Sequence, residues 1–590
     1  MKKNILFFTI AMTAVLTSCN DLLELPNDGR MTMDDVFKTR NNVLGYLNSC
    51  YNYRIEPSME RDALTDNSTH SEDMFGNSIY NRWYNDGYSA TSYTNTDGAP
   101  WESLYQGIRK CNIFIANMES LDPSTIPNYD GEISSWIAEV RTLRAYYYLE
   151  LIKRYGACPI LTVAYETTHD FGTNVRSSVS EVVTQIVADC DDALAAPEVN
   201  LGFSWKVGAG QRGIMTRAMA HFIKAQALLF AASPQFADGT YSYADALEAN
   251  RAALGACLAN GYELFNTAPA IGVAQNVYAF YFISAADEQQ AFDKEYIYPG
   301  HTVAVWQTSG MPTTSGQLAA GACPSQELVD CYEMQATGEP PITGYSDPQH
   351  LSPIINTASG YDPDKPYEGR DPRFYATVYY NGSMRSLENS SDPENIIETY
   401  VGGSEGLSAT DRRYTHTGYY LRKYNNWKSN SDNSADGQIR KFRLGELYLN
   451  FAEAAYQASA SPYDKISLGN GMSMSAVDAV NAIRRRAGMP DFPTGMSKTD
   501  FEKKYRNERR VELAFEDVYY FDVRRWKTMP ETSRYVTGMR ITNDGSGYKY
   551  ERFSLERTSY GEKYYLYPLN VTEVNKMTDH TGVNWQNPGW

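Results

Sequence analysis

Apolar residues recur at intervals of three and four positions over two long stretches in the first half of the chain. The first stretch covers residues 136–155 and is followed by Gly156 and Pro159. The second covers residues 215–229 and stops before Pro234. Because an α-helix turns once in about 3.6 residues, this spacing gathers the apolar side chains on one helix face. Both stretches therefore predict helices that end at glycine or proline.

The same pattern divides the chain into three parts. Residues 33–266 are predicted to be helical. Residues 267–437 are rich in Gly, Pro, Asn, Ser and Tyr and contain only short strand-like runs such as 376–380. Helical periodicity returns in residues 438–590. We expect one compact, mostly α globule over 33–590 with helix pairs like tetratricopeptide repeats, although no clean repeat of about 34 residues is visible, so the repeats are degenerate.

The N-terminus has the features of a secretion signal. Two lysines precede an apolar stretch, Ile5–Leu16, which is too short to span a bilayer and is followed by Thr17-Ser18-Cys19. The spacing resembles the lipobox of bacterial lipoproteins, so residues 1–18 are predicted to be a signal peptide that is removed before Cys19. Lipidation of Cys19 would anchor the protein, because two or more acyl chains bind a membrane stably. Residues 19–32 would form a flexible tether.

The charge of the chain limits its partners. The sequence has 53 Lys and Arg against 71 Asp and Glu, a formal net charge of −18. The predicted cleavage removes two lysines and no acidic residue, which makes the mature charge −20. An acidic surface argues against nucleic acid and against anionic lipid head groups.

Seven cysteines follow Cys19, and they form no CxxC pair and no metal-like spacing with histidine. We expect buried free thiols. A Cys323–Cys331 disulfide is the alternative in an exported protein. The seven are Cys50, Cys111, Cys158, Cys190, Cys257, Cys323 and Cys331.

Motifs that suggest a cofactor fail on closer comparison. Residues 208–213 match GxGxxG, but no βαβ unit surrounds them, and we interpret them as a lead-in to a helix that begins near Thr216. Residues 432–437 resemble the first half of a calcium loop, yet Arg443 stands where a bidentate Glu is required. The seven histidines are scattered, with no HxxxH. We expect no cofactor and no metal, with a structural calcium ion as the weaker alternative.

Carboxylate pairs are the remaining signal for catalysis. Glu508 and Glu512 lie one helical turn apart, and Asp522 and Arg525 follow nearby. We interpret this group as a structural ion-pair network rather than as a catalytic pair. A glycosidase pair among the 71 carboxylates would leave no sequence signature, so a glycoside hydrolase stays an alternative.

Several separated segments together match the pattern of one known family. They are Val140–Leu161, Gly213–Pro234, Pro324–Met334, Gly369–Gly382, Phe442–Gln457, Asn481–Pro490, Arg506–Lys527 and Gln586–Trp590. Their number, their order and the lipobox in front of them resemble the SusD/RagB family of nutrient-binding outer-membrane lipoproteins. In that family Gly often follows Ala-Phe-Glu, where this chain has Asp517.

This resemblance implies a SusD-like fold with four degenerate tetratricopeptide-like helix pairs and a loop-rich, ligand-binding region with short strands. It implies a lipid-anchored protein exposed on the outer membrane of a Gram-negative bacterium. The implied partner is a SusC-like TonB-dependent transporter, over whose mouth the protein closes as a lid. Ligands in the family are oligosaccharides, or peptides in the RagB branch, and no catalysis is attributed to it. We therefore predict a glycan-binding protein that is not an enzyme, with peptide capture as the alternative.

The ligand residues are predicted from the chemistry of sugars. A pyranose ring has an apolar face and a rim of hydroxyl groups, so flat aromatic rings beside hydrogen-bonding side chains suit it. Among 46 Tyr and 9 Trp, the segment 80–88 alternates the two kinds most densely, and we expect it to be exposed. Packing is the alternative role, and Trp101 is expected to lie in the core. The predicted ligand residues are Trp83, Tyr84, Tyr88, Asn81 and Asp86, and in a second group Tyr296, Tyr298 and Trp306.

Overall fold

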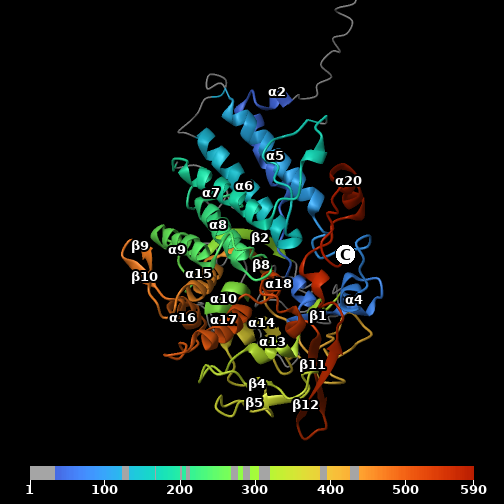
Figure 1. Ribbon diagram of the computed structural model, residues 1–590. Coiled ribbons are helices and arrows are strands. Elements are labelled where there is room, and N and C mark those ends of the chain that lie inside the picture. The colour runs from blue at the N-terminus through green and yellow to red at the C-terminus, as the bar shows by residue number, and fades with distance from the viewer. Residues whose placement is uncertain are drawn as a thin grey trace, which may run out of the picture.

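The computed structural model shows a mostly helical protein (Figure 1). Helices make up 45% of it and strands 12%, which confirms the mostly α class. The structure describes residues 33–121, 126, 132–166, 168–198, 202–206, 213–267, 277–283, 293–303, 319–385, 395–425 and 437–590.

Long helices pack side by side in one continuous array (Figure 1). From α5 to α9 each helix packs against the next, and α15 and α16 extend the array from the C-terminal part of the chain. Stacking of consecutive helices in this way is the packing of degenerate tetratricopeptide-like pairs. The helices are α5 (Trp101–Glu119), α6 (Glu132–Tyr155), α7 (Val179–Ala195), α8 (Arg217–Ala232), α9 (Tyr243–Ala259), α15 (Leu444–Ala458) and α16 (Ala476–Ala487).

Both helices predicted from the apolar spacing are present with the predicted ends. Helix α6 contains residues 136–155, and Gly156 follows it with a φ of +69°, a left-handed conformation that favours glycine. Helix α8 begins after Thr216, whose side chain accepts a hydrogen bond from the Met219 amide at 3.2 Å. The helix start near Thr216 is therefore confirmed, whereas most of the glycine-rich lead-in lies outside the described residues.

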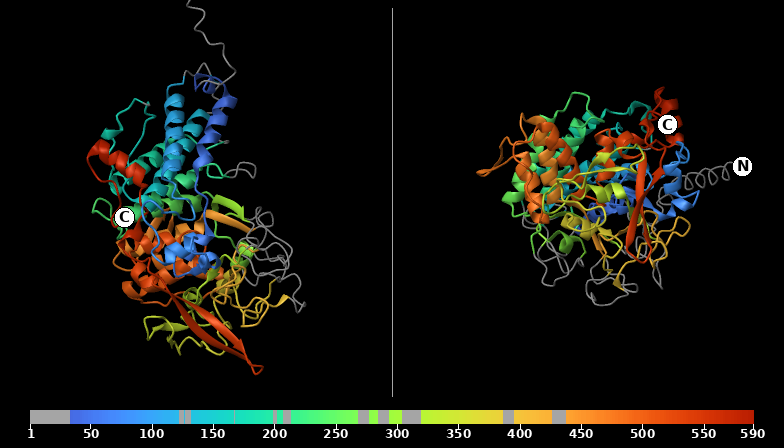
Figure 2. Two further views of the ribbon diagram at one scale, coloured as in Figure 1. Left: turned by 90° about the vertical axis from the view of Figure 1, so that its right-hand side faces the viewer. Right: turned by 90° about the horizontal axis from the view of Figure 1, so that it is seen from below.

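Within the described ranges, strands occur as six antiparallel pairs. The long hairpin β11–β12 projects from the lower end of the molecule (Figures 1 and 2). The pairs are β1 (Ser68–His70) with β3 (Ala322–Pro324), β2 (Tyr296–Val303) with β8 (Gly437–Arg443), β4 (Ile342–Tyr345) with β5 (Pro353–Ile355), β6 (Val378–Tyr379) with β7 (Tyr420–Leu421), β9 (Ile466–Gly469) with β10 (Met472–Met474), and β11 (Tyr535–Asn543) with β12 (Tyr548–Glu556).

The strand expected at 376–380 is only partly correct. The side chain of Asp371 caps helix α14 and Pro372 occupies its first turn, so residues 376 and 377 are helical and the strand begins at Val378. The remaining α-helices are α2 (Met33–Val36), α3 (Arg40–Cys50), α4 (Ile79–Tyr84), α10 (Val277–Ile283), α13 (Gln326–Cys331), α14 (Pro372–Thr377), α17 (Lys498–Glu512), α18 (Tyr519–Arg525), α19 (Met529–Thr532) and α20 (Val571–Thr581).

The C-terminal part of the chain contributes to both large hydrophobic clusters. Leu47 near the start, Leu449 in the helical array and Trp585 near the end belong to one buried cluster. A second cluster closes the loop-rich part, where Phe374 packs in the same group as Phe515. Residues far apart in sequence are thus buried together in each cluster.

The seven cysteines of the described chain are free thiols, which confirms the expectation and makes the alternative Cys323–Cys331 disulfide wrong. The two residues are held on separate rigid elements, Cys323 in strand β3 and Cys331 at the end of helix α13. The Cys323 thiol instead contacts the Gly321 carbonyl oxygen at 3.5 Å. Burial raises the pKa of Cys323 to about 12, so its thiol is held in the unreactive form.

Candidate functional site

The aromatic cluster predicted to bind ligand is buried. Trp83 is only 2% exposed, and Tyr84 and Tyr88 are buried beside it in the main core. The Trp83 ring packs edge-on against Tyr564 with ring centroids 4.8 Å apart. The expectation that this cluster is exposed is therefore wrong, and in this conformation these rings offer no open face for stacking on a sugar.

The local structure explains the burial. Residues 79–84 form helix α4 rather than a turn, so Tyr80, Trp83 and Tyr84 share one helix face, which turns toward the core. The Tyr84 hydroxyl donates to the Ala63 carbonyl oxygen at 2.9 Å. The spacing of three and four was visible in the sequence and would have predicted this packing.

The two polar residues of the first predicted group also have structural partners. The Asn81 side chain donates to the Asp73 carbonyl oxygen at 2.7 Å, which ties α4 to the segment before it. Asp86 is exposed, and its carboxylate lies 2.5 Å from the Lys563 ammonium and accepts a hydrogen bond from Tyr564. Their role in ligand binding stays a prediction.

The second predicted group is split by the structure. Tyr298 is buried in strand β2, where its hydroxyl lies 2.6 Å from the Arg54 guanidinium. Tyr296 is half-buried in the same strand, opposite Arg443 of β8. Trp306 lies outside the described residues. The structure therefore shows a packing role for Tyr298 and does not describe the surroundings of Trp306.

Three further predictions fall outside the described residues: the lipidated Cys19, the tether 19–32 and the calcium-like turn before Gly437. In the described ranges, no His, Cys, Asp and Glu side chains gather into a group of three that could hold a metal ion. No helix of those ranges is long and apolar enough to cross a membrane.

A strand pair joins the chain before the first predicted segment to the chain after the second. Strand β1 precedes α4 and pairs with β3, which follows the segment that carries Trp306. The pairing continues beyond the strands, because the Ser71 amide donates to the Gly321 carbonyl oxygen at 2.9 Å. A third segment joins here, since the Ala320 amide donates to the Arg412 carbonyl oxygen at 2.7 Å. Three parts of the chain that are distant in sequence therefore meet at this sheet.

Beside this sheet lies an exposed surface that we call the β1–β3 rim, formed by Glu72, Asp73, Met74, Phe75 and Arg412. Met74 is 38% exposed and Phe75 is 41% exposed, which is unusual for large apolar side chains. The Arg412 guanidinium lies 3.1 Å from the Glu72 carboxylate and 6.0 Å from the Phe75 ring centroid. The rim thus places a partly exposed aromatic ring, with a guanidinium over it, next to a carboxylate.

The polypeptide under the rim is held firmly. Asp73 Oδ1 lies 2.8 Å from Nδ1 of the buried His416, and the Asp73 carbonyl oxygen accepts the bond from Asn81. Because the backbone is fixed from both sides, the exposed side chains are presented with little freedom to lose on binding. Phe75 follows a 3₁₀ turn, Ser71–Met74, and belongs to no helical or strand pattern. An apolar residue outside any periodic pattern was the signal that could have found it.

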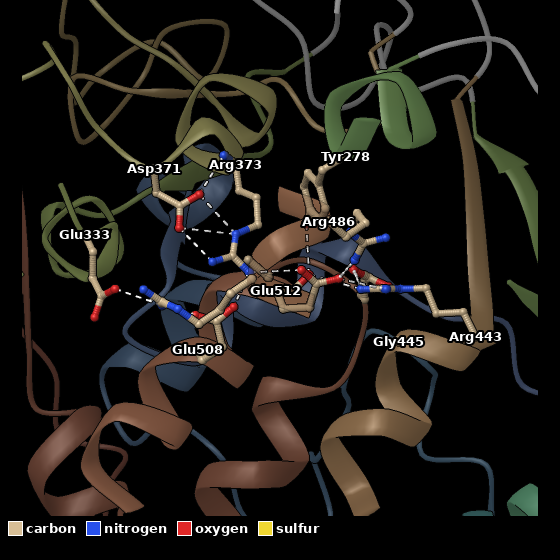
Figure 3. Close-up of polar contacts among 12 residues, drawn as sticks. Tyr278, Glu333, Asp371, Arg373, Arg443, Gly445, Arg486, Glu508 and Glu512 are labelled. Carbon is tan, nitrogen blue, oxygen red and sulfur yellow. Dashed lines mark hydrogen bonds and ion pairs between the residues drawn. The ribbon is translucent and has the colours of Figure 1, made fainter. Parts of the chain in front are cut away.

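The carboxylates predicted to be structural form a buried network (Figure 3). The Arg373 guanidinium lies 2.5 Å from Glu508 and 3.0 Å from Glu512, and it also pairs with Asp371 at 2.7 Å. Arg443 adds a contact of 2.9 Å to Glu512. Every one of these side chains is nearly inaccessible to solvent, and the interpretation as an ion-pair network is confirmed.

The other predicted members, Asp522 and Arg525, lie in a second buried group of ion pairs. Asp522 lies 2.6 Å from Arg509 and 2.9 Å from Arg525. Burial by itself would raise the pKa of Glu512, but the guanidinium groups of three arginines reverse the effect and lower the pKa to about 2. A carboxylate that stays ionised and fully paired at neutral pH is poorly suited to exchange protons with a substrate.

The fold and the rim define a class of protein: a helical-repeat protein in which loops from distant parts of the chain form one exposed aromatic and polar surface. The chain belongs to the SusD family, since the model of that family matches residues 282–590. A second family model, described as starch-binding associating with outer membrane, matches residues 21–198.

Solved structures share the fold. A SusD-like protein from Bacteroides fragilis NCTC 9343 is 23% identical, with a TM-score of 0.74 over 96% of this chain and 100% of the other. A SusD-like carbohydrate binding protein from the same strain is 19% identical, with a TM-score of 0.66 over 92% of this chain and 98% of the other. A SusD-like protein from Formosa agariphila is 24% identical over 202 residues, which span 32% of this chain and only 36% of that relative.

Proposed function

We propose that the protein is a cell-surface glycan-binding lipoprotein that captures oligosaccharides and delivers them to a SusC-like TonB-dependent transporter. The observation that carries the proposal is the β1–β3 rim, where the exposed Phe75 ring lies beside Arg412 and Glu72. Membership of the SusD family supports it, as does the match to a family model described as starch-binding. One similar structure is called a carbohydrate binding protein.

The rim has the groups that a sugar requires. The C–H face of a pyranose stacks on an exposed ring such as Phe75, and the ring hydroxyls accept from Arg412 and donate to Glu72. The Arg412–Glu72 pair is more than one-third exposed on both sides, so exchanging it for bonds to hydroxyl groups costs little. Because only one aromatic ring and one charged pair contact the ligand, the affinity of the rim for an oligosaccharide is expected to be modest.

Anchoring compensates for modest affinity. A lipid on Cys19 would keep the binder on the same membrane as its transporter, at high effective concentration. The family description as associating with outer membrane supports this location. Capture followed by transfer to a neighbouring transporter then needs no chemical step by this protein.

A glycan array tests the proposal. Residues 20–590, which include every described element, are applied as wild type, as Phe75→Ala and as Arg412→Ala. We expect the wild type to bind oligosaccharides, and we expect Phe75→Ala to weaken binding about tenfold, because one stacked ring is lost. The matched control is Tyr548→Ala, which removes another exposed aromatic residue from the hairpin β11–β12.

Two results would contradict the proposal. Wild-type protein that binds no glycan but binds members of a peptide library would support the peptide-capturing alternative. Release of reducing sugar from mixed polysaccharides would support a glycoside hydrolase. Equal affinities of Phe75→Ala and Tyr548→Ala would retain glycan binding but remove the rim as its site.

A further inference from the structure

A hollow of about 740 Å³ opens on the side of the helical array, and it shares no residue with the β1–β3 rim. Its floor is helix α5, one wall is the segment from Pro159 to Asn174, and the other wall is helix α20 with Asn570 in front of it. In Figure 1 these elements lie next to one another at the upper right. Its size falls in the range of about 300–1,000 Å³ that is usual for small-molecule sites.

The wall that faces α20 is fixed to α5 by hydrogen bonds from three consecutive helical turns. The Tyr105 hydroxyl donates to the Pro159 carbonyl oxygen at 2.8 Å, and the Arg109 guanidinium donates to that of Tyr165 at 2.6 Å. The Asn112 side chain donates to the carbonyl oxygens of Leu161 at 2.9 Å and Val163 at 3.1 Å. The hollow is therefore built before any ligand arrives, which lowers the entropic cost of binding.

A buried arginine orients the last of these contacts. The Arg144 guanidinium donates to the Asn112 side-chain oxygen at 2.8 Å, so the Asn112 amide nitrogen must point at the wall. Arg144 is itself held by Asp189 at 2.5 Å. This chain of contacts runs from the core of the array to the wall of the hollow.

Aromatic rings line the hollow on two sides. Trp101 and Tyr105 lie on α5 with ring centroids 5.0 Å apart, and both are half-buried, so Trp101 is not the core residue expected from the sequence. Tyr165 and the exposed Phe171 face them from the wall, held together by His169, which stacks on Tyr165 at 3.9 Å. Three amide side chains also line the hollow, those of Gln106, Asn174 and Asn570.

The charges at the hollow cancel. Glu102 and Glu573 stand against Arg109 and Lys576, in a chain whose overall charge is strongly negative. A neutral ligand meets no net repulsion or attraction here, whereas an anionic one gains no excess of positive charge. Flat rings, amides and balanced charge are together the recognition chemistry of uncharged sugars.

We propose that this hollow is a second carbohydrate site, which binds a neutral oligosaccharide independently of the β1–β3 rim. The inference rests on the proposed glycan-binding function. Two sites on one rigid body would let a long glycan bind more tightly than a short one, provided that it spans both. A helix of a partner protein is the other conceivable occupant, but it would require a continuous apolar groove rather than rings interrupted by amides and opposite charges.

The test replaces Val163 with a larger residue that fills the hollow and leaves the hydrogen bonds of the wall intact. Val163 is 53% exposed and lines the hollow, and it contributes only its backbone oxygen to the wall. Val163→Arg therefore occupies the space, and Val175→Arg, at a residue that is 60% exposed and outside the hollow, is the matched control. A double variant, Tyr165→Ala with Phe171→Ala, removes the two aromatic rings of the wall. Thermal melting verifies that each variant is folded.

Residues 20–590 of each variant are screened on an array of neutral and anionic oligosaccharides, with Phe75→Ala in parallel. We expect Val163→Arg to lose at least about fivefold in signal for a set of neutral glycans that Val175→Arg retains. Equal glycan binding by the two arginine variants overturns the inference and leaves the proposed function intact. A wild type that binds no glycan refutes the proposed function itself. Loss of binding that is confined to anionic glycans also overturns the inference.

Discussion

The buried carboxylate of Glu512 allows a quantitative test of the interpretation that this network is structural. Its two oxygens contact Arg443 at 2.9 Å and Arg373 at 3.0 Å, and Arg486 pairs with it as well; none of these side chains is more than 3% exposed. The change Glu512→Gln keeps the shape and removes the charge. It leaves three buried guanidinium groups with one partner fewer, and losing one partner of a buried pair typically costs about 3–5 kcal/mol.

The pKa of Glu512 gives a second value for how much this ionised carboxylate stabilises the folded protein. A decrease from the ordinary value of 4.5 to about 2 corresponds to about 3 kcal/mol of stabilisation, at about 1.4 kcal/mol for each pH unit. Because the folded-state pKa is the lower one, this stabilisation is present above pH 4.5 and is lost as the pH falls toward 2. The difference in free energy of unfolding between wild type and Glu512→Gln should therefore shrink by about 2 kcal/mol from pH 6 to pH 3.

Urea denaturation followed by tryptophan fluorescence measures both quantities. The control is Glu502→Gln on the same helix, where the carboxylate pairs with Arg506 at 2.6 Å but both side chains are about one-third exposed, so a change within about 0.5 kcal/mol is expected. A decrease in the free energy of unfolding of less than about 1 kcal/mol for Glu512→Gln at pH 6, or a decrease that does not depend on pH, would refute the reasoning. Glycan binding of the folded variant should equal that of the wild type.

Three further predictions concern packing, thiols and the anchor. Gly107→Ala should cost about 1–3 kcal/mol in thermal or urea unfolding, because the new Cβ would lie 2.7 Å from the buried Tyr147 ring, whereas Gly45→Ala, with nothing within 4 Å, should be neutral or slightly stabilising. Iodoacetamide at pH 8 should leave the native thiols of Cys158 and Cys257 unmodified until urea unfolds the chain, because burial raises the pKa of each to about 12; rapid labelling of the native protein would contradict this. Cys19→Ala should abolish incorporation of labelled palmitate and support of glycan uptake, while glycan binding in solution persists; uptake that survives the change would show that the lipid is dispensable.

Many of the helices can be predicted from the sequence because they depend on residues that are close together in the chain. The spacing of apolar residues predicts helices α6 and α8 with their ends, since periodicity and the stop signals at Gly156 and Pro234 act within a few residues. The separated family segments predict the fold. The charge and spacing of Glu508 and Glu512 predict an ion-pair network, but their partners Arg373 and Arg443 lie far away in the sequence and are supplied by the fold.

The surfaces were decided only by tertiary structure. Whether an aromatic residue is exposed depends on what packs against it, and Trp83 is buried by Tyr564, which lies far away in the sequence. Phe75 lies after a short turn, outside any helical or strand pattern, and it stays exposed beside the pair β1–β3. The sequence pattern separates the two residues, but only the fold shows which groups surround each of them.

The hollow beside α5 shows the same division. The sequence by itself determined that residues 33–266, which include α5, are largely helical, and that the chain is acidic and resembles its family. Only the folded chain fixes the segment after Pro159 to that helix, through hydrogen bonds between residues about fifty positions apart, and places helix α20 at the opposite side of the hollow. Local chemistry determines the helices and strands, whereas long-range contacts determine which of their side chains are exposed to solvent. Ligand binding depends on these exposed side chains.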